Sequence, residues 1–413
     1  MTSDTKYSAP APPIPPPLRG SEAGTFAHYS VTVRLPDIGR RMIAENDFSM
    51  EIAGNLAALI GEIPEGLICP LKDRSAPDFG AWTRYIEPYL GQNWLEVPWF
   101  FAETYFYRRA LDAIGYFEPG PGHGLDPFAW QKRQGLEANA EAIGSLASGL
   151  SMQLAEDDRD EQAKLRRVVK KNLWGNQADL SLWPAGDGEG PGRAEEADRD
   201  ERILVDDSQN VSKFLSDKQR KHGRVDFIMD NAALELVNDL ALADYLLGTG
   251  LTESVRLHLK SHPTFVSDAM VKDVQLAIAY LYASSDSQVQ DLGKRLEQHV
   301  RAERFQLVED FFWTSPLAFW EMPATLRTEL SYADLLISKG DANYRRLLGD
   351  RHWPFITPAE DVLRYVPAPL VALRVCKSEV IVGLRPGQPE ELDQVDPDWK
   401  INGEWGMIQF VRP

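Results

Sequence analysis

The sequence predicts an α/β protein in which a helical N-terminal part packs on a three-layer α/β/α sandwich with a mainly parallel sheet. Apolar residues recur at three- and four-residue intervals from about residue 26 to residue 183, as they do in helices. After about residue 200, short apolar runs alternate with helical segments, which is typical of a parallel sheet covered on both faces. The length of 413 residues allows two or three domains.

The composition excludes several classes of protein. The chain has 44 Lys and Arg against 62 Asp and Glu, for a formal net charge of −18. So acidic a chain offers no broad cationic surface to nucleic acid, and we expect no nucleic-acid partner. An anionic ligand must therefore be bound by a local group of cations or by a metal.

Cysteine usage and the lack of targeting segments indicate an intracellular protein. Cys69 and Cys376 lie far apart and form no C-x-x-C pair, which argues against a disulfide framework and a zinc site. The first twenty residues lack the apolar core of a secretory signal, and no run of about 18 apolar residues could span a membrane. We expect a cytoplasmic protein, with the nucleus as a second compartment, and no membrane partner.

Composition divides the chain into three stretches. Residues 1–24 form a Pro-rich tail that favours polyproline II and is expected to be disordered. Residues 25–200 form a mainly helical domain, in which the aromatic segment 99–117 is expected to be a buried helix. This domain ends in an acidic loop at residues 185–201. Residues 201–413 form the α/β domain.

The α/β domain contains short apolar runs that we expect to be strands, each followed by a polar turn. They cover residues 225–230, 254–260, 304–310, 333–340 and 369–375. In open parallel sheets ligands bind outside the carboxyl ends of the strands. The polar residues that follow the expected strands are Asp230, Asn231, His262, Ser267, Asp268, Glu309, Asp310, Lys339, Asp341, Asn343, Tyr344, Arg345, Arg374 and Lys377.

These residue types favour a site for a metal and a phosphate group. Asp230, Asn231 and Asp268 offer the oxygen ligands that suit Mg²⁺ or Mn²⁺. Lysine and arginine beside a metal would neutralise and hold a phosphate. The Walker pattern and a G-x-G-x-x-G after a strand are both missing, which argues against a kinase and a dinucleotide enzyme. The combination indicates hydrolysis of a phosphate ester.

A structural alternative stays open for several of these side chains. An Asp between a strand and a helix is often only the N-cap of the helix, and this applies to Asp230, Asp268 and Asp341. His262 precedes a proline in a turn and is expected to be structural, and Lys377 could be a plain surface lysine. Convergence at one edge of the sheet favours the functional interpretation, because independent caps would not need it.

Several strings carry a family resemblance, from about residue 25 to the end of the chain. They are PWFFAETYFYRR, LWGNQADLSL, DFIMDNAALELVNDLALADYLL, HPTFVSD, FWTSP, ISKGDANYRRLLGD and LRVCKSEVIVGL. In this combination the chain resembles the damage-control phosphatases, a metal-dependent family. The eukaryotic subgroup of that family has also been described as protein-glutamate methyltransferases.

The resemblance implies roles for residues in these strings. Asp230, Asn231 and Asp268 match the family's metal ligands, for Mn²⁺ or Mg²⁺, with Co²⁺ or Ni²⁺ as further candidates, and Asp230 and Asn231 also contact substrate. The subgroup's R-T-x-K signature is Arg374, Val375, Cys376 and Lys377 here, so a valine replaces the threonine and its hydroxyl is lost, whereas the phosphate-binding lysine is kept. The residues implied to line the phosphate and sugar are Lys339, Asp341, Ala342, Asn343, Tyr344, Arg345, Arg374 and Lys377.

The implied activity is hydrolysis of sugar phosphates such as fructose 1-phosphate and of related reactive phosphometabolites. Lys377 and Arg345 would neutralise developing charge, and the attacking group would be either water or an Asp. Glu103, Arg108 and Trp313 are candidates for pocket walls that select the substrate.

Two other functions remain as alternatives. A protein carboxyl methyltransferase would need to bind S-adenosylmethionine, yet no glycine-rich turn follows the first strand expected in the α/β domain. An interaction protein without catalysis would use the Pro-rich tail and the acidic loop.

Overall fold

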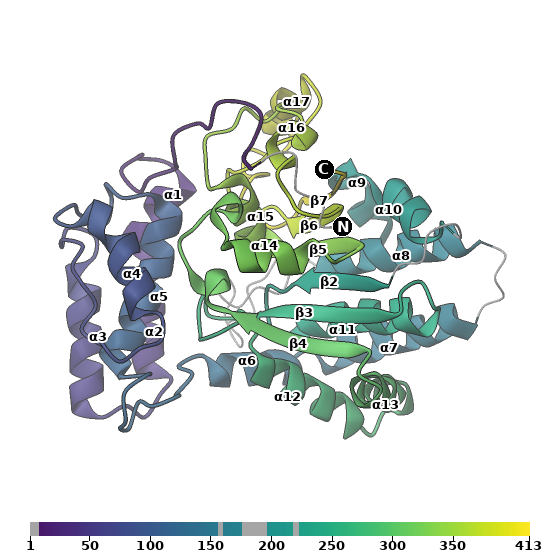
Figure 1. Ribbon diagram of the computed structural model, residues 1–413, viewed down its shortest axis with the longest axis horizontal. Coiled ribbons are helices and arrows are strands. Elements are labelled where there is room, and N and C mark those ends of the chain that lie inside the picture. Colours follow the sequence, from purple (N-terminus) through teal and green to yellow (C-terminus); the bar gives the residue numbers. More distant parts are fainter. Residues whose placement is uncertain (1–7, 156–159, 176–195, 218–222) are drawn as a thin grey trace.

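The computed structural model describes residues 8–155, 160–175, 196–217 and 223–413. A helical part lies beside an α/β part built around one sheet (Figure 1). The predicted fold class is confirmed. Most of the expected acidic loop lies outside the described residues, and its last residues belong to a short helix, α9 (Glu196–Glu201). Among the described helices none is long and apolar enough to cross a bilayer.

The sheet has seven strands in the order β1-β7-β6-β5-β2-β3-β4. Neighbouring strands are parallel except for the antiparallel pair of β6 and β7. All five expected strands are present, and the two strands that the sequence did not predict, β1 and β7, form one edge of the sheet. The strands are β1 (Ile203–Asp206), β2 (Arg224–Ile228), β3 (Ser254–Lys260), β4 (Phe305–Asp310), β5 (Leu335–Lys339), β6 (Leu370–Val375) and β7 (Gly406–Val411).

Helices cover both faces of this sheet, as expected for parallel strands joined by helical connections (Figure 1). On one face lie α14 (Ala324–Leu330), α15 (Gly340–Leu348) and α16 (Ala359–Leu363), and α17 (Gln388–Val395) precedes β7. The other face is covered by α6 (Ala129–Glu137), α7 (Ala140–Ala155), α8 (Glu161–Trp174), α10 (Ser208–Leu215), α11 (Ala233–Gly248), α12 (Val271–Tyr282) and α13 (Ser287–Arg301).

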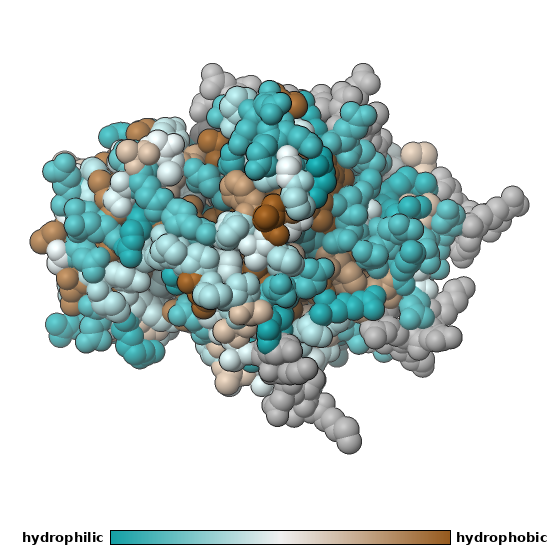
Figure 2. Space-filling view, turned by 90° about the horizontal axis from the view of Figure 1, so that it is seen from above, coloured by the Kyte–Doolittle hydropathy of each residue, from teal (hydrophilic) through white to brown (hydrophobic). Residues whose placement is uncertain are grey.

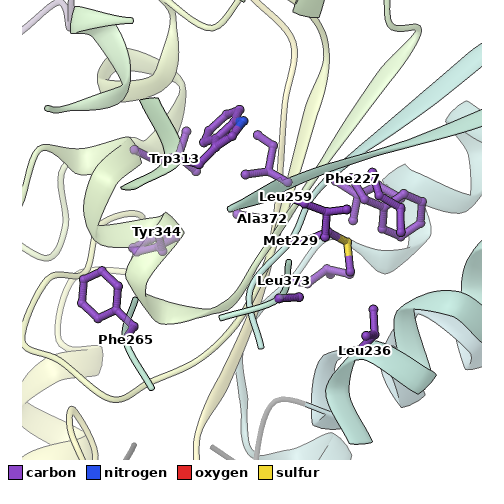
Figure 3. Packing of buried hydrophobic residues seen from close by; sticks show 14 of the residues in the cluster. Phe227, Met229, Leu236, Leu259, Phe265, Trp313, Tyr344, Ala372 and Leu373 are labelled. Carbon is purple, nitrogen blue, oxygen red and sulfur yellow. The ribbon is translucent and has the colours of Figure 1, made fainter. Parts of the chain in front are cut away.

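The core of the α/β part joins the sheet to these helices. Phe227 of β2, Leu259 of β3 and Leu373 of β6 pack there with Leu236 of α11 and Tyr344 of α15 (Figure 3). Each is almost completely buried. β2 and β6 are buried on both sides along almost their whole length, because they lie between the two helical layers. This rigid centre fixes where the loops at the strand ends emerge.

The helical part lies beyond the carboxyl ends of the central strands (Figure 1). The aromatic segment forms its central helix, α5, which is buried along most of its length, as predicted. A single π-helical turn, η1, joins α1 to α2. The elements of this part are α1 (Phe26–Tyr29), η1 (Ser30–Arg34), α2 (Leu35–Ala44), α3 (Met50–Glu62), α4 (Phe79–Ile86) and α5 (Trp99–Ile114).

The N-terminal segment differs from the expected disordered tail over its described residues, 8–24. The backbone N–H of Leu18 donates to the carbonyl of Asp350 at 3.0 Å, and the Leu18 carbonyl accepts from the N–H of Trp99 at 2.8 Å. The Leu18 side chain is buried. An extended proline-rich chain can pack in this way because its backbone groups remain available to neighbouring segments. The segment therefore links the α/β part to α5.

The surface seen from above is mainly hydrophilic, with isolated apolar side chains between the charged ones (Figure 2). This agrees with a sequence in which 26% of the residues are charged. Single exposed apolar residues of this kind are usual on globular proteins and do not by themselves mark a partner site.

Candidate active site

The candidate site lies where the chain direction in the sheet reverses. The adjacent strands β2 and β5 lead in opposite directions, β2 to β3 and β5 to β6. Such a switch point leaves a crevice at the carboxyl ends of the two strands. A small cleft that is open to solvent is found there. Its lining includes the predicted site residues Asp230, Asn231, Asp268, Asp341, Ala342, Arg345 and Lys377.

Backbone pairing holds the loops after β2 and β3 together beside the cleft. Asn231 and Asp268 form an isolated antiparallel bridge. The N–H of Ala269 donates to the carbonyl of Asp230 at 2.8 Å, and the N–H of Ala232 donates to the carbonyl of Ser267 at 2.6 Å. The two loops therefore place Asp230, Asn231 and Asp268 in one wall of the cleft.

The Asn231 amide is oriented by three hydrogen bonds. Its Oδ1 accepts from the Ser267 hydroxyl at 2.6 Å, and its Nδ2 donates to Glu235 Oε2 at 2.8 Å and to Asp230 Oδ2 at 3.1 Å. Buried polar networks of this kind fix side-chain orientation. The structure thus adds Glu235 and Ser267 as supports of the predicted site.

Asp268 forms a buried ion pair with Lys260, at 2.8 Å between Oδ2 and Nζ. Lys260 is the last residue of β3, and its ammonium also donates to the Met229 carbonyl at 3.3 Å. Lys260 was not among the site residues predicted from the sequence. The sequence feature that could have indicated it is a lysine at the end of a run expected to be a buried strand.

Left-handed backbone conformations also mark the loops of the site. Ala233, Phe265 and Val266 have φ values of 57°, 46° and 65°. Such conformations are unfavourable for residues with a Cβ and cluster at functional sites. Phe265 lines the cleft and was not predicted as a site residue. Its conformation could not be inferred from the sequence.

The capping alternative is wrong for the carboxylates at the strand ends. The N-cap residues of α11, α12 and α15 are Ala232, Met270 and Lys339. The Asp341 carboxylate instead accepts from the N–H of Lys377 at 3.2 Å and forms an ion pair with Arg374. These carboxylates are therefore held by groups other than their own helix N-termini.

Arg345 is fixed by two carboxylates and an aromatic ring. Its Nε lies 2.8 Å from Asp350 Oδ1, its Nη1 lies 2.6 Å from Glu103 Oε2, and its guanidinium stacks at 3.4 Å from the Trp99 ring centroid. Burial alone would lower the pKa of Arg345, but Asp350 and Glu103 raise it above its usual value. The cleft therefore keeps a permanent positive charge that is already oriented.

Four predicted substrate-binding residues are absent from the lining. The ammonium of Lys339 points toward helices α8 and α11, where it lies 3.0 Å from Asp239 Oδ1 of α11 and 2.8 Å from Asn172 Oδ1 of α8. Asn343 donates to the Met229 carbonyl at 2.9 Å, and Tyr344 donates to the Gln409 side chain at 2.6 Å. The four residues Lys339, Asn343, Tyr344 and Arg374 are buried behind the cleft wall that they support.

The other candidates have structural partners. Arg108 pairs with Asp78 at 2.9 Å, and the Trp313 ring packs against His258. His262 donates from Nδ1 to the Pro263 carbonyl at 3.1 Å, and its burial lowers its pKa to about 4. His262 is therefore neutral near pH 7. None of the three lines the cleft.

The oxygen-rich wall of the cleft has the donor chemistry of a site for a hard divalent metal. Asp230, Asn231 and Asp268 present carboxylate and amide oxygens from neighbouring, mutually anchored loops. Within the described part of the chain, no group of three or more His, Cys, Asp and Glu side chains gathers as a metal site. A metal in this cleft would therefore need the amide oxygen of Asn231 beside the two carboxylates.

This fold and this cleft define an α/β protein whose site, at a switch point in the sheet, combines oxygen ligands with cations. A family model described as "Damage-control phosphatase ARMT1-like domain" matches residues 30–392. The chain therefore belongs to the ARMT1-like damage-control phosphatases, a family of phosphatases, as its motifs indicated.

Similar proteins span nearly the whole chain. The damage-control phosphatase ARMT1 of Danio rerio is 34% identical, and the alignment covers 97% of each chain. The human protein of that name is 30% identical, with 97% of this chain and 99% of that chain covered. A solved DUF89 family protein from Pyrococcus horikoshii has a TM-score of 0.48 and 14% identity, and the match covers 92% of this chain and 97% of that one.

The close approach of Gly340 to Asp230 gives a prediction about stability. Gly340 has a φ of +79°, and a Cβ there would lie 1.7 Å from Asp230 Oδ2. We expect Gly340→Ala to lower the free energy of unfolding by about 2 kcal/mol or more, because the clash adds to the backbone strain. Denaturant titration measures this change.

Gly54→Ala is the matched control. Gly54 is in α3, and an added Cβ would meet nothing within 4 Å. We expect this variant to be as stable as the parent protein or up to about 1 kcal/mol more stable. Equal stability of the Gly340→Ala variant and the parent would contradict the tight contact with Asp230.

Proposed function

We propose that the cleft hydrolyses phosphate monoesters of small sugars, such as fructose 1-phosphate, in a reaction that depends on a divalent metal. The observation that carries the proposal is the meeting of two kinds of side chain in one cleft. Asp230, Asn231 and Asp268 provide metal-type oxygen donors, and Arg345 and Lys377 provide cations for a phosphoryl group.

The metal would be held by Asp230, Asn231 and Asp268, with Mn²⁺ or Mg²⁺ as the first candidates and Co²⁺ or Ni²⁺ as others. When bound, the metal would act as a Lewis acid and offset negative charge on the phosphoryl oxygens. Ser267 and Glu235 keep the Asn231 amide in one orientation, and Lys260 keeps the Asp268 carboxylate in place. These supports would reduce the reorganisation needed on binding.

Positioning and charge stabilisation are the main contributions of this chain to phosphoryl transfer. The bond from phosphorus to the sugar oxygen breaks while a new bond to the attacking oxygen forms, and negative charge spreads over the phosphoryl oxygens. Arg345 and Lys377 would stabilise that charge. Because Arg345 is already held by Asp350 and Glu103, it would do so with little loss of conformational freedom.

The methyltransferase and interaction alternatives gain no support from the described residues. The turn between β2 and α11 consists of Met229, Asp230, Asn231 and Ala232, without the glycines that let a backbone approach a nucleoside-linked cofactor. The described part of the N-terminal segment packs against the protein through residues such as Leu18 and is not a free docking segment.

The metal-ligand hypothesis predicts that Asp230→Asn and Asp268→Asn each lower metal-stimulated phosphate release at least a hundredfold. Each variant removes a negative charge from the proposed site at nearly unchanged volume. The measurement is kcat/KM for fructose 1-phosphate with added Mn²⁺. The exposed Asp37 of α2 provides the control, and Asp37→Asn should keep the parent rate. Normal turnover in either site variant would refute the ligand assignment.

Lys377→Ala tests the cationic side of the site. We expect kcat/KM to fall about 100- to 1,000-fold, the usual loss when one group that stabilises the transition state is removed. Lys294, an exposed lysine of α13, serves as control, and Lys294→Ala should have no effect on the rate. An unchanged kcat/KM in Lys377→Ala would exclude a role for this ammonium in phosphate hydrolysis.

A further inference from the structure

The helical part contributes a cation, Arg34, to the cleft of the α/β part. Arg34 lines the cleft, and 11% of its side chain is exposed. It is the last residue of the π-helical turn Ser30–Arg34, which lies between α1 and α2. Single π turns inside helices are uncommon and are frequently found at functional sites. Arg34 was not among the site residues predicted from the sequence.

Arg34 is held by a buried network that leads to the other arginine of the cleft. The Ser30 hydroxyl accepts from Arg34 Nε at 3.2 Å and from Nη2 at 3.0 Å, and it donates to Glu103 Oε1 at 3.0 Å. Glu103 Oε1 also pairs with Arg34, while Glu103 Oε2 pairs with Arg345 at 2.6 Å. Glu103 is completely buried. One carboxylate thus sets the positions of two guanidinium groups from the two parts of the molecule.

A second contact joins the helical segment that precedes Arg34 to the loop that carries Lys377. Phe26 also lines the cleft, and its backbone N–H donates to Glu379 Oε1 at 2.7 Å. The Phe26 ring packs edge-on against Trp99, the ring on which Arg345 stacks. The three cations of the cleft, on three separate segments, are therefore placed relative to one another by side chains that are mostly buried.

The charges of the cleft lining balance once Arg34 is included. Among the described residues, the lining holds three acidic side chains, Asp230, Asp268 and Asp341, and three basic ones, Arg34, Arg345 and Lys377. A divalent metal would then leave an excess of two positive charges in the lining, which matches the dianion of a phosphate monoester. Without Arg34 the lining would have one positive charge fewer.

We propose that Arg34 is a substrate-binding residue that binds the phosphoryl group of the substrate from the helical part of the protein. This inference rests on the proposed phosphatase function and adds a third cation to its phosphate site. A guanidinium suits this role because its charge is permanent and its planar N–H groups match the oxygens of a phosphoryl group, and because Ser30 and Glu103 hold this one in position. The helical part is thereby a portion of the binding site itself.

The test is the affinity for inorganic phosphate, measured by titration calorimetry in the presence of Mn²⁺, together with KM for fructose 1-phosphate. We expect Arg34→Ala to weaken phosphate binding and to raise KM about 10- to 100-fold, as for loss of a charge-assisted hydrogen bond. Arg34→Lys should weaken both by a smaller factor, because it keeps the charge but loses the paired donors. Arg40→Ala, at an exposed position of α2, is the control and should change neither value.

Phosphate affinity equal to that of the parent in folded Arg34→Ala or Arg34→Lys would overturn the inference. So would a raised KM with unchanged phosphate affinity, because the contact would then be with the sugar. The melting temperature identifies a folded variant, and Arg34→Lys serves if Arg34→Ala does not fold. If the parent protein binds phosphate but hydrolyses no monoester, the proposed phosphatase function fails. Weaker phosphate binding by Arg34→Ala than by the parent would still support phosphate binding by Arg34. A parent protein that binds no phosphate refutes the inference directly.

Discussion

The carboxylate of Asp230 occupies the space where a side chain at position 340 would lie, and the rest of the site depends on this contact. It brings the turn after β2 against the first residue of α15, at the point where the chain direction in the sheet reverses. Glycine is needed there for both the space and the positive φ. The oxygen donors that follow β2 and the side chains of α15 thereby meet in one cleft.

Charge compensation is the second requirement of this arrangement. The carboxylates and cations at the cleft are largely buried, and burying an unpaired charge costs several kcal/mol. Lys260 therefore accompanies Asp268, Arg374 accompanies Asp341, and Glu103 lies between two arginines. These pairs orient the groups before a ligand arrives. Such preorganisation is the property that phosphoryl transfer requires of a protein.

The α/β class and one wall of the site could be predicted from sequence because both follow from local patterns. Asp230, Asn231 and Asp341 lie two or three residues beyond the ends of β2 and β5, and in a parallel sheet those strand ends meet at one edge. Position at a strand end does not decide which face a side chain takes. Lys339 thus points toward Asp239 and away from the cleft. The antiparallel direction of β7 likewise depends on pairing with β6, which apolar periodicity does not encode.

The side of the cleft that the helical part forms could not be predicted from the sequence, for a different reason. Arg34 looks like any other charged residue of an amphipathic helix. Its place in the cleft results from a π turn and from its ion pair with Glu103, which also pairs with Arg345 of α15, about 300 residues further along the chain than Arg34. The aromatic segment forms a buried helix, as expected. Its Glu103 was expected only as a candidate for the pocket wall, whereas in the structure it forms an ion pair that positions Arg345. The N-terminal segment is ordered over its described residues because Leu18 finds backbone partners on both parts.

The most direct test of this account is a phosphate-release assay of the purified protein over a panel of sugar phosphates. It is performed with Mg²⁺, Mn²⁺, Co²⁺ or Ni²⁺ and again after treatment with a chelator. The account predicts release from at least one sugar monophosphate with a divalent metal, loss of that release with chelator, and its recovery when metal is restored. Hydrolysis that is equally fast in excess chelator, or no release from any monoester with any of the four metals, would contradict it.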